Sequence, residues 1–111
     1  MQIQSNPVWQ SKTAQQLAEA LVVIEDQQAM QNFLRDVMTE KEILEISARL
    51  EAAKMLQAGN KYTDIVAKTK LSSRTVARIS DWLQNGAGGY QVALTALDTH
   101  HHDHLSPARA E

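Results

Sequence analysis

The stretch KYTDIVAKTKLSSRTVARISDWL, residues 61–83, decides the fold. Its first part predicts a short helix with Thr63 as the cap and Asp64 in the first turn, where the helix dipole stabilises a carboxylate. The apolar side of this helix consists of Ile65, Val66 and Ala67. The apolar pattern then breaks, so we expect a turn at positions 70 and 71.

A second helix follows this turn, and either Ser72 or Ser73 caps its start. Its apolar residues are spaced at i, i+3 and i+7, so they share one buried face. They are Val76, Ile79 and Leu83. The opposite face is small and basic, with Arg74, Thr75, Ala77 and Arg78. This layout is typical of a helix-turn-helix, whose second helix enters the DNA major groove and reads base edges with its first residues.

The distribution of charge supports this prediction, although the total charge does not. The chain has 111 residues, a net charge of −2 and a pI near 6.1, which alone disfavours a nucleic-acid partner. Residues 54–83 hold six cations and two anions, a local charge of +4, so the rest of the chain carries −6. DNA binding depends on cations at the contact face, because each neutralised phosphate releases counterions. We therefore expect a DNA-binding surface here, with an ordinary solvated surface as the alternative.

Length and composition favour a single all-α domain. The chain has no Cys, which excludes disulfides and fits a cytoplasmic location. No apolar run approaches the roughly 18 residues that span a bilayer. The N-terminus, MQIQSNPVWQSK, lacks the basic start and apolar core of a signal peptide, so we expect neither export nor anchoring.

The part of the chain before the central helix predicts an arm and two helices. Residues 1–9 form a loose arm, and residues 10–27 form a long amphipathic helix. In that helix the consecutive apolar residues 21–24 nearly encircle the axis, which indicates partners on several sides. A second helical piece covers residues 29–37.

A long helix then leads into the helix-turn-helix. Thr39 and Glu42 predict a capping box at its start, and Gly59 lies where a helix-ending glycine is expected. Its core face consists of Ile43, Ile46, Leu50 and Ala53. A glycine-rich break precedes a short last helix over residues 90–97. We expect the folded domain to cover residues 10–97, and residues 98–111 to be a disordered polar tail.

Residues 38–83 resemble the Trp repressor family. The match rests on Met38, Thr39 and the acidic residues after them, Arg49, Leu56, Gly59, Ile65 and the TVAR run at 75–78. Gly88, Gly89 and Tyr90 further resemble the Trp repressor-like subgroup labelled YerC/YecD. The likeness is good from about residue 33 to residue 94, whereas the first helix matches only in length and character.

The resemblance implies six helices per subunit and an intertwined homodimer that represses transcription from sequence-specific sites on double-stranded DNA. The first helices and the last one would wrap the partner, which accounts for the apolar surface at residues 21–24. Two recognition helices would lie about 34 Å apart, one turn of DNA, on a palindromic site. A monomeric bundle is the alternative.

In the family, tryptophan binds between the central helix and the recognition helix, flanked by two arginines. The residues at the matching positions are Thr39, Arg49, Ala52, Ala53, Thr75, Arg78 and Ile79. Members that bind tryptophan have glycine directly after the second arginine, where this chain has Ile79. Ala52 and Ala53 stand where the family has larger aliphatic residues, so we expect Ile79 to fill the space that tryptophan occupies in the family. We therefore expect that no corepressor or cofactor is needed. The alternative is a repressor that responds to a tryptophan-like or other small effector between Arg49 and Arg78.

The resemblance also divides the predicted DNA contacts into two groups. Ser73, Arg74 and Ala77 hold the positions that face bases, and Arg74 suits a bidentate contact to guanine. Phosphate contacts set the register and orientation of the protein on the DNA duplex. Their candidates are Lys61, Thr63, Lys68, Lys70, Ser72 and Arg78.

Other functions have less support. The run His100, His101, His102, Asp103, His104 offers metal ligands, but on a polar tail we expect no dedicated metal site. No nucleophile is paired with a base at useful spacing, and no glycine-rich phosphate loop follows a strand, so we do not expect an enzyme. An interaction module for protein or RNA would keep the same fold. The basic recognition face disfavours a protein partner. The small number of aromatic residues disfavours RNA, because few side chains could stack on bases.

Overall fold

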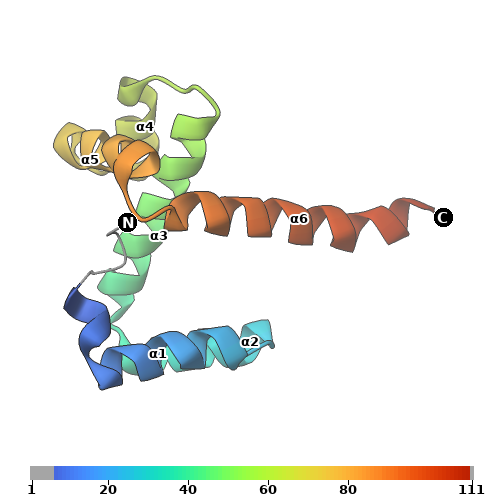
Figure 1. Cartoon of the computed structure of the whole chain (residues 1–111). Helices are drawn as coiled ribbons and strands as arrows, with labels where there is room; N and C mark the ends of the chain where they lie inside the picture. Colours follow the sequence, from blue (N-terminus) through green and yellow to red (C-terminus); the bar gives the residue numbers. More distant parts are fainter. Residues whose placement is uncertain (1–6, 111) are drawn as a thin grey trace. The chain divides into compact units, whose positions relative to one another are not determined.

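The computed structural model describes the backbone of residues 7–110 and the side chains of residues 7–101 (Figure 1). It begins with a short 3-10 helix, η2 (Pro7–Gln10). The α-helices are α1 (Lys12–Val23), α2 (Gln27–Val37), α3 (Glu40–Gln57), α4 (Tyr62–Thr69), α5 (Ser73–Asn85) and α6 (Gly89–Ala110). No strand occurs among the described residues, so the predicted six-helix, all-α class is confirmed.

The chain divides into two compact units, residues 1–44 and residues 45–111. The boundary falls inside the continuous helix α3, so one domain over residues 10–97 stays a prediction. Of the predicted loose arm, residues 1–6 lie outside the described part, and the remainder enters η2. The carbonyl of Trp9 accepts a hydrogen bond from Gln15 Nε2 at 2.7 Å, which ties η2 to α1.

The first unit contains a helix break that lies a few residues earlier than the sequence predicted. The prediction of one helix over residues 10–27 is wrong, because α1 ends at Val23 and a new helix begins at Gln27. Asp26 causes the break. Its Oδ2 accepts a hydrogen bond from the backbone N–H of Ala29 at 2.9 Å, so Asp26 caps α2 from an extended conformation.

Both ends of α3 follow the prediction. At the start, Thr39 Oγ1 accepts from Glu42 N at 3.1 Å and Thr39 N donates to Glu42 Oε1 at 2.8 Å, which is a complete capping box. At the end, Gly59 has φ of 88°. The N–H groups of Gly59 and Asn60 donate to the carbonyls of Leu56 and Met55, both at 3.0 Å, as in a Schellman motif.

The second unit has a small core formed by α3, α4, α5 and α6. Its buried residues are Ala52, Ala53, Ile65, Val76, Ile79 and Leu94. The predicted buried face of α5 is confirmed at Val76 and Ile79, and the half-buried Leu83 packs against the same cluster. Ala67 and Ile46 were predicted on apolar faces, but both are exposed.

Helix α6 is longer than predicted. It continues to Ala110, whereas the sequence predicted a helix over residues 90–97 followed by a disordered tail. Residues 98–106 contain neither glycine nor proline, so nothing in them ends a helix. Polar composition alone therefore does not predict where a helix ends. Figure 1 shows α6 running as a rod away from α5, the helix that precedes it in the same unit.

No described helix is both long enough and apolar enough to cross a bilayer. No three described His, Cys, Asp or Glu side chains gather where they could hold a metal ion. The side chains of His102, Asp103 and His104 lie outside the described part.

Candidate nucleic-acid interface

Helices α4 and α5 form the helix-turn-helix, with residues 70–72 as the turn. Lys70 adopts a left-handed conformation, with φ of 65° and ψ of 11°. Its backbone N–H donates to the Val66 carbonyl at 2.9 Å, and its Nζ donates to the Ala67 carbonyl at 3.0 Å. These bonds satisfy carbonyls that the end of α4 would leave unpaired, and so offset the cost of a positive φ at a lysine.

The start of α4 differs from the prediction. Lys61, not Thr63, holds the capping position, and no side-chain cap bond forms there. The extended conformation of Lys61 lets its carbonyl accept the first helical hydrogen bond, from Ile65 N at 3.0 Å. Thr63 therefore lies inside the first turn, where its side chain is exposed.

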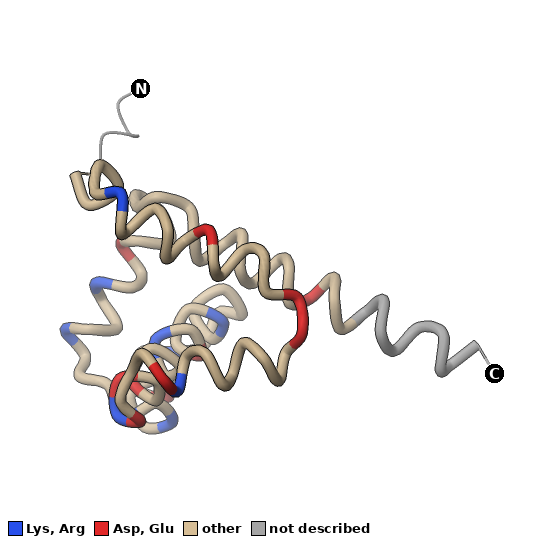
Figure 2. Tube along the Cα trace, turned by 90° about the horizontal axis from the view of Figure 1, so that it is seen from below, with Lys and Arg blue, Asp and Glu red and all other residues tan. Residues whose placement is uncertain are grey.

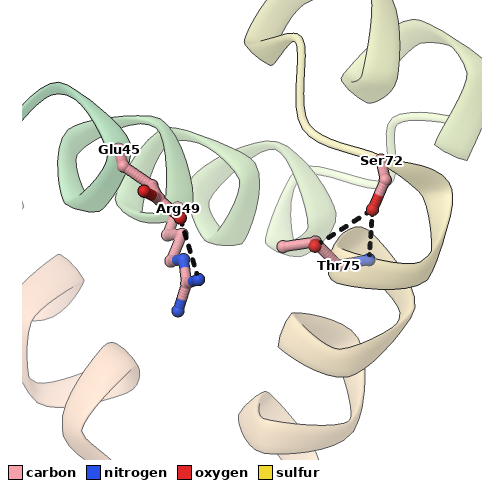
Figure 3. A network of polar contacts seen from close by, with 4 residues as sticks. All are labelled: Glu45, Arg49, Ser72 and Thr75. Carbon is pink, nitrogen blue, oxygen red and sulfur yellow. Dashed lines mark hydrogen bonds and ion pairs between the residues drawn. The ribbon is translucent and has the colours of Figure 1, made fainter. Parts of the chain in front are cut away.

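The start of α5 is fixed by Ser72, which decides between the two predicted serine caps. Ser72 Oγ accepts a hydrogen bond from Thr75 N at 3.1 Å and lies 3.0 Å from Thr75 Oγ1 (Figure 3). Ser73 is the first residue of the helix and is exposed. The hydroxyl of Thr75 is half-buried and engaged with the cap, so Thr75 supports the turn.

One face of α5 is free at the end where a recognition helix reads bases. Its exposed residues are Ser73, Arg74, Ala77 and Arg78. Their spacing places them on one side of the helix, opposite the buried Val76 and Ile79. The structure thus brings these predicted contact residues together on one surface whose orientation the core determines.

The cations of this region are exposed, but they are not equally available. Five cationic side chains of the helix-turn-helix reach solvent: Lys61, Lys68, Lys70, Arg74 and Arg78. Figure 2 marks Lys and Arg in blue, and the described part of α6 carries none. Lys68 lies next to an anion, because its Nζ is 3.6 Å from Glu51 Oε2 on α3. The sequence analysis did not single out Glu51, since this pair forms only when α4 folds against α3.

The space expected for an effector holds protein side chains. Ala52, Ala53 and Ile79 each have no exposed area and belong to the same core cluster. Arg78 is on the exposed side of α5 instead. Thr39 is engaged in the capping box of the first unit.

Arg49, the other candidate effector ligand, is paired within its own helix. Its Nη2 donates to Glu45 Oε2 at 3.2 Å (Figure 3). Its Nε is buried and has no hydrogen-bond partner among the described residues. Burial raises the pKa of the nearby Tyr90 phenol above its ordinary value, while the positive charge of Arg49 acts in the opposite direction. Tyr90 therefore lies close enough to Arg49 to sense its charge.

Comparison with known proteins places this geometry in a family. The model of the Trp repressor protein family matches residues 12–98. The protein YerC of Bacillus subtilis is 34% identical over 83 residues, which cover 75% of this chain and 80% of YerC. A TrpR-like protein from Eubacterium eligens has a crystal structure with a TM-score of 0.74 and 35% identity, and the match covers 79% of this chain and 91% of that one. A putative Trp repressor from Staphylococcus aureus gives a TM-score of 0.76 and 28% identity, with coverage of 88% and 95%.

The two serines before α5 allow a direct test of the cap. Replacing Ser72 by Ala removes the acceptor for Thr75 N and should lower the free energy of unfolding by about 1 kcal/mol. Ser73→Ala is the matched control and should change it by less than about 0.5 kcal/mol. Urea unfolding followed by circular dichroism measures both. Equal losses for the two variants would contradict the assignment of Ser72 as the cap.

Proposed function

The chain belongs to the Trp repressor family, and we propose that it represses transcription as a homodimer on palindromic DNA without tryptophan. Members of this family are DNA-binding regulators rather than enzymes. One observation carries the proposal for this chain. Helix α5 is fixed by the buried Val76 and Ile79 and by the Ser72 cap, while its first turns present an exposed, basic face. Such a regulator works in the compartment that holds the DNA, which for a bacterial member is the cytoplasm.

The exposed face of α5 suits the major groove. Ser73, Arg74 and Ala77 would face base edges, and Arg74 would donate two hydrogen bonds to a guanine. The predicted phosphate-contact residues are all exposed and lie at the start of α4, at its end, in the turn and on α5. They are Lys61, Thr63, Lys68, Lys70, Ser72 and Arg78, with Thr75 holding the cap beneath them. Their contacts would set the orientation of α5 without selecting a sequence.

Exposed apolar side chains support the homodimer. Val22 and Val23 on α1 and Val92 on α6 are 78%, 63% and 69% exposed. A stable monomer seldom leaves so many large aliphatic side chains in water, because burying each one is worth roughly 1.5–3 kcal/mol. The second copy of the chain would cover them, and would also place two recognition helices about one DNA turn apart.

The packing of Ile79 supports a regulator that needs no tryptophan. Ile79 and the two facing alanines have no exposed area, so an indole ring could enter only by displacing Ile79 from the core. Glu45 also offers Arg49 an internal carboxylate, the group that an amino-acid effector would otherwise supply. An effector-dependent repressor remains the second candidate, favoured by the buried Nε of Arg49 that the described residues leave unpaired.

The two classes of DNA contact should respond differently to substitution. Arg74→Ala should abolish the preference for guanine at one position of each half-site, which costs about 1–3 kcal/mol of discrimination. Lys70→Ala should weaken binding to all sequences alike and reduce the salt slope by about one unit per subunit. Fluorescence anisotropy on duplexes with single base-pair changes measures both effects. An unchanged preference in Arg74→Ala, or an unchanged slope in Lys70→Ala, would contradict the corresponding assignment.

A charge placed on α1 tests the homodimer. In a monomer Val22→Lys should have little effect, because Val22 is largely exposed. In the proposed dimer it buries a lysine and should weaken association at least tenfold. Gln16→Lys, on an exposed position of the same helix, adds the same charge and should leave association unchanged. Sedimentation equilibrium distinguishes the 12.4 kDa chain from its dimer. A wild-type protein that sediments with the mass of the monomer would contradict the proposed homodimer.

Calorimetry tests the filled effector space. Titration of the wild-type protein with tryptophan should give no binding in the micromolar range. Ile79→Ala should lower the free energy of unfolding by about 2–5 kcal/mol, because it leaves a cavity in the core. Micromolar binding of tryptophan by the wild-type protein would show that Ile79 does not block the site.

A further inference from the structure

A carboxylate lies between two lysines beside the helix-turn-helix. Glu51, on α3, has Oε2 3.6 Å from Lys68 Nζ on α4 and Oε1 3.6 Å from Lys54 Nζ on its own helix. The Glu51 side chain is 32% exposed, and those of Lys68 and Lys54 are 64% and 68% exposed. The carboxylate is therefore the more enclosed partner, and both ammonium groups reach solvent.

The distances indicate an electrostatic contact rather than a fixed hydrogen bond. A charge-assisted N–H···O bond measures about 2.7–2.9 Å, shorter than both contacts of Glu51. A contact of this length lowers the potential around Lys68 without fixing the direction of its side chain. Glu51 is thus poorly suited to aim Lys68 at a phosphate, but well placed to neutralise part of its charge.

We propose that Glu51 competes with DNA phosphates for Lys68 and so limits the affinity of this protein for DNA of unrelated sequence. The inference rests on the proposed DNA-binding function, in which Lys68 contacts a phosphate. A phosphate that approaches Lys68 must either displace the carboxylate or bind next to it. In both cases the charge of Glu51 opposes the phosphate at short range.

This competition acts on affinity and not on the choice of base, because Glu51 lies next to a lysine that contacts phosphate. Phosphate contacts supply nearly all of the sequence-independent affinity, and a genome offers a very large excess of unrelated sites. A protein with one phosphate contact weakened leaves each of these sites more readily. By partly neutralising one cation, Glu51 lowers binding to every sequence equally and leaves the contribution of Arg74 intact.

Removing the charge tests the inference with little change in shape. Glu51→Gln should bind a duplex of unrelated sequence about three- to tenfold more tightly at about 150 mM salt. Its plot of log K against log salt should be steeper by up to about one unit per subunit, because the charge that Lys68 brings to its phosphate is no longer partly neutralised. The matched control is Glu45→Gln. This variant makes the same change in net charge on the same helix, but the cation that it frees is Arg49, which is not a predicted phosphate contact. It should alter the affinity for DNA less than twofold.

A double-variant cycle identifies the lysine through which Glu51 acts. In a Lys68→Ala background, Glu51→Gln should tighten binding no more than Glu45→Gln does. The inference is overturned if Glu51→Gln binds no more tightly than Glu45→Gln, or if its gain survives the loss of Lys68. Wild-type binding to the same duplex tests the proposed function separately. Binding without a Glu51 effect overturns this inference alone, whereas no wild-type binding at about 50 mM salt overturns both.

Discussion

The packing of α5 against the two alanines of α3 is the contact on which the rest of the second unit depends. Ala52 and Ala53 of α3 and Ile79 of α5 belong to one buried cluster, and none of the three has any exposed area. Because Ile79 and Val76 have no exposed area, α5 cannot rotate without exposing them to water. The direction of its basic face is therefore set by the core, and the Ser72 cap fixes where the helix begins.

The chemistry of the surface depends on where charge lies more than on its total. An acidic chain carries a positive helix-turn-helix because its cations are concentrated between residues 54 and 83. Glu51 is the anion that the fold brings among them, through a contact between α3 and α4. In the proposed function, different residues would control affinity for the phosphate backbone and discrimination between bases. Lys68 with Glu51 would set the first, and Arg74 the second.

Local signals in the sequence predicted the helices well, and the two main differences in helix bounds also have local causes. The capping box at Thr39 and the ending at Gly59 are local hydrogen-bond patterns, and both are present. The break at Asp26 was also local but was predicted a few residues too late, although the apolar repeat ends at Ile24. The extension of α6 beyond Leu97 was missed because polar composition was taken as a sign of disorder.

Some features of the candidate site could be predicted from the sequence, whereas others depend on the fold. Periodicity predicted which side of α5 is buried, since that depends on spacing alone. It did not predict which lysines have an anion nearby, because Glu51 and Lys68 are far apart in the sequence and meet only in the fold. The Ser72 cap needed the structure for a simpler reason, since two adjacent serines satisfy the same pattern.

The central claim is that α5 is held ready to read DNA by its own core, without a small effector. Selection of bound duplexes from a random library by the wild-type protein, at about 150 mM salt with and without tryptophan, tests it most directly. The account predicts the same palindrome under both conditions. Enrichment only in the presence of tryptophan, or no enrichment under either condition, would contradict it.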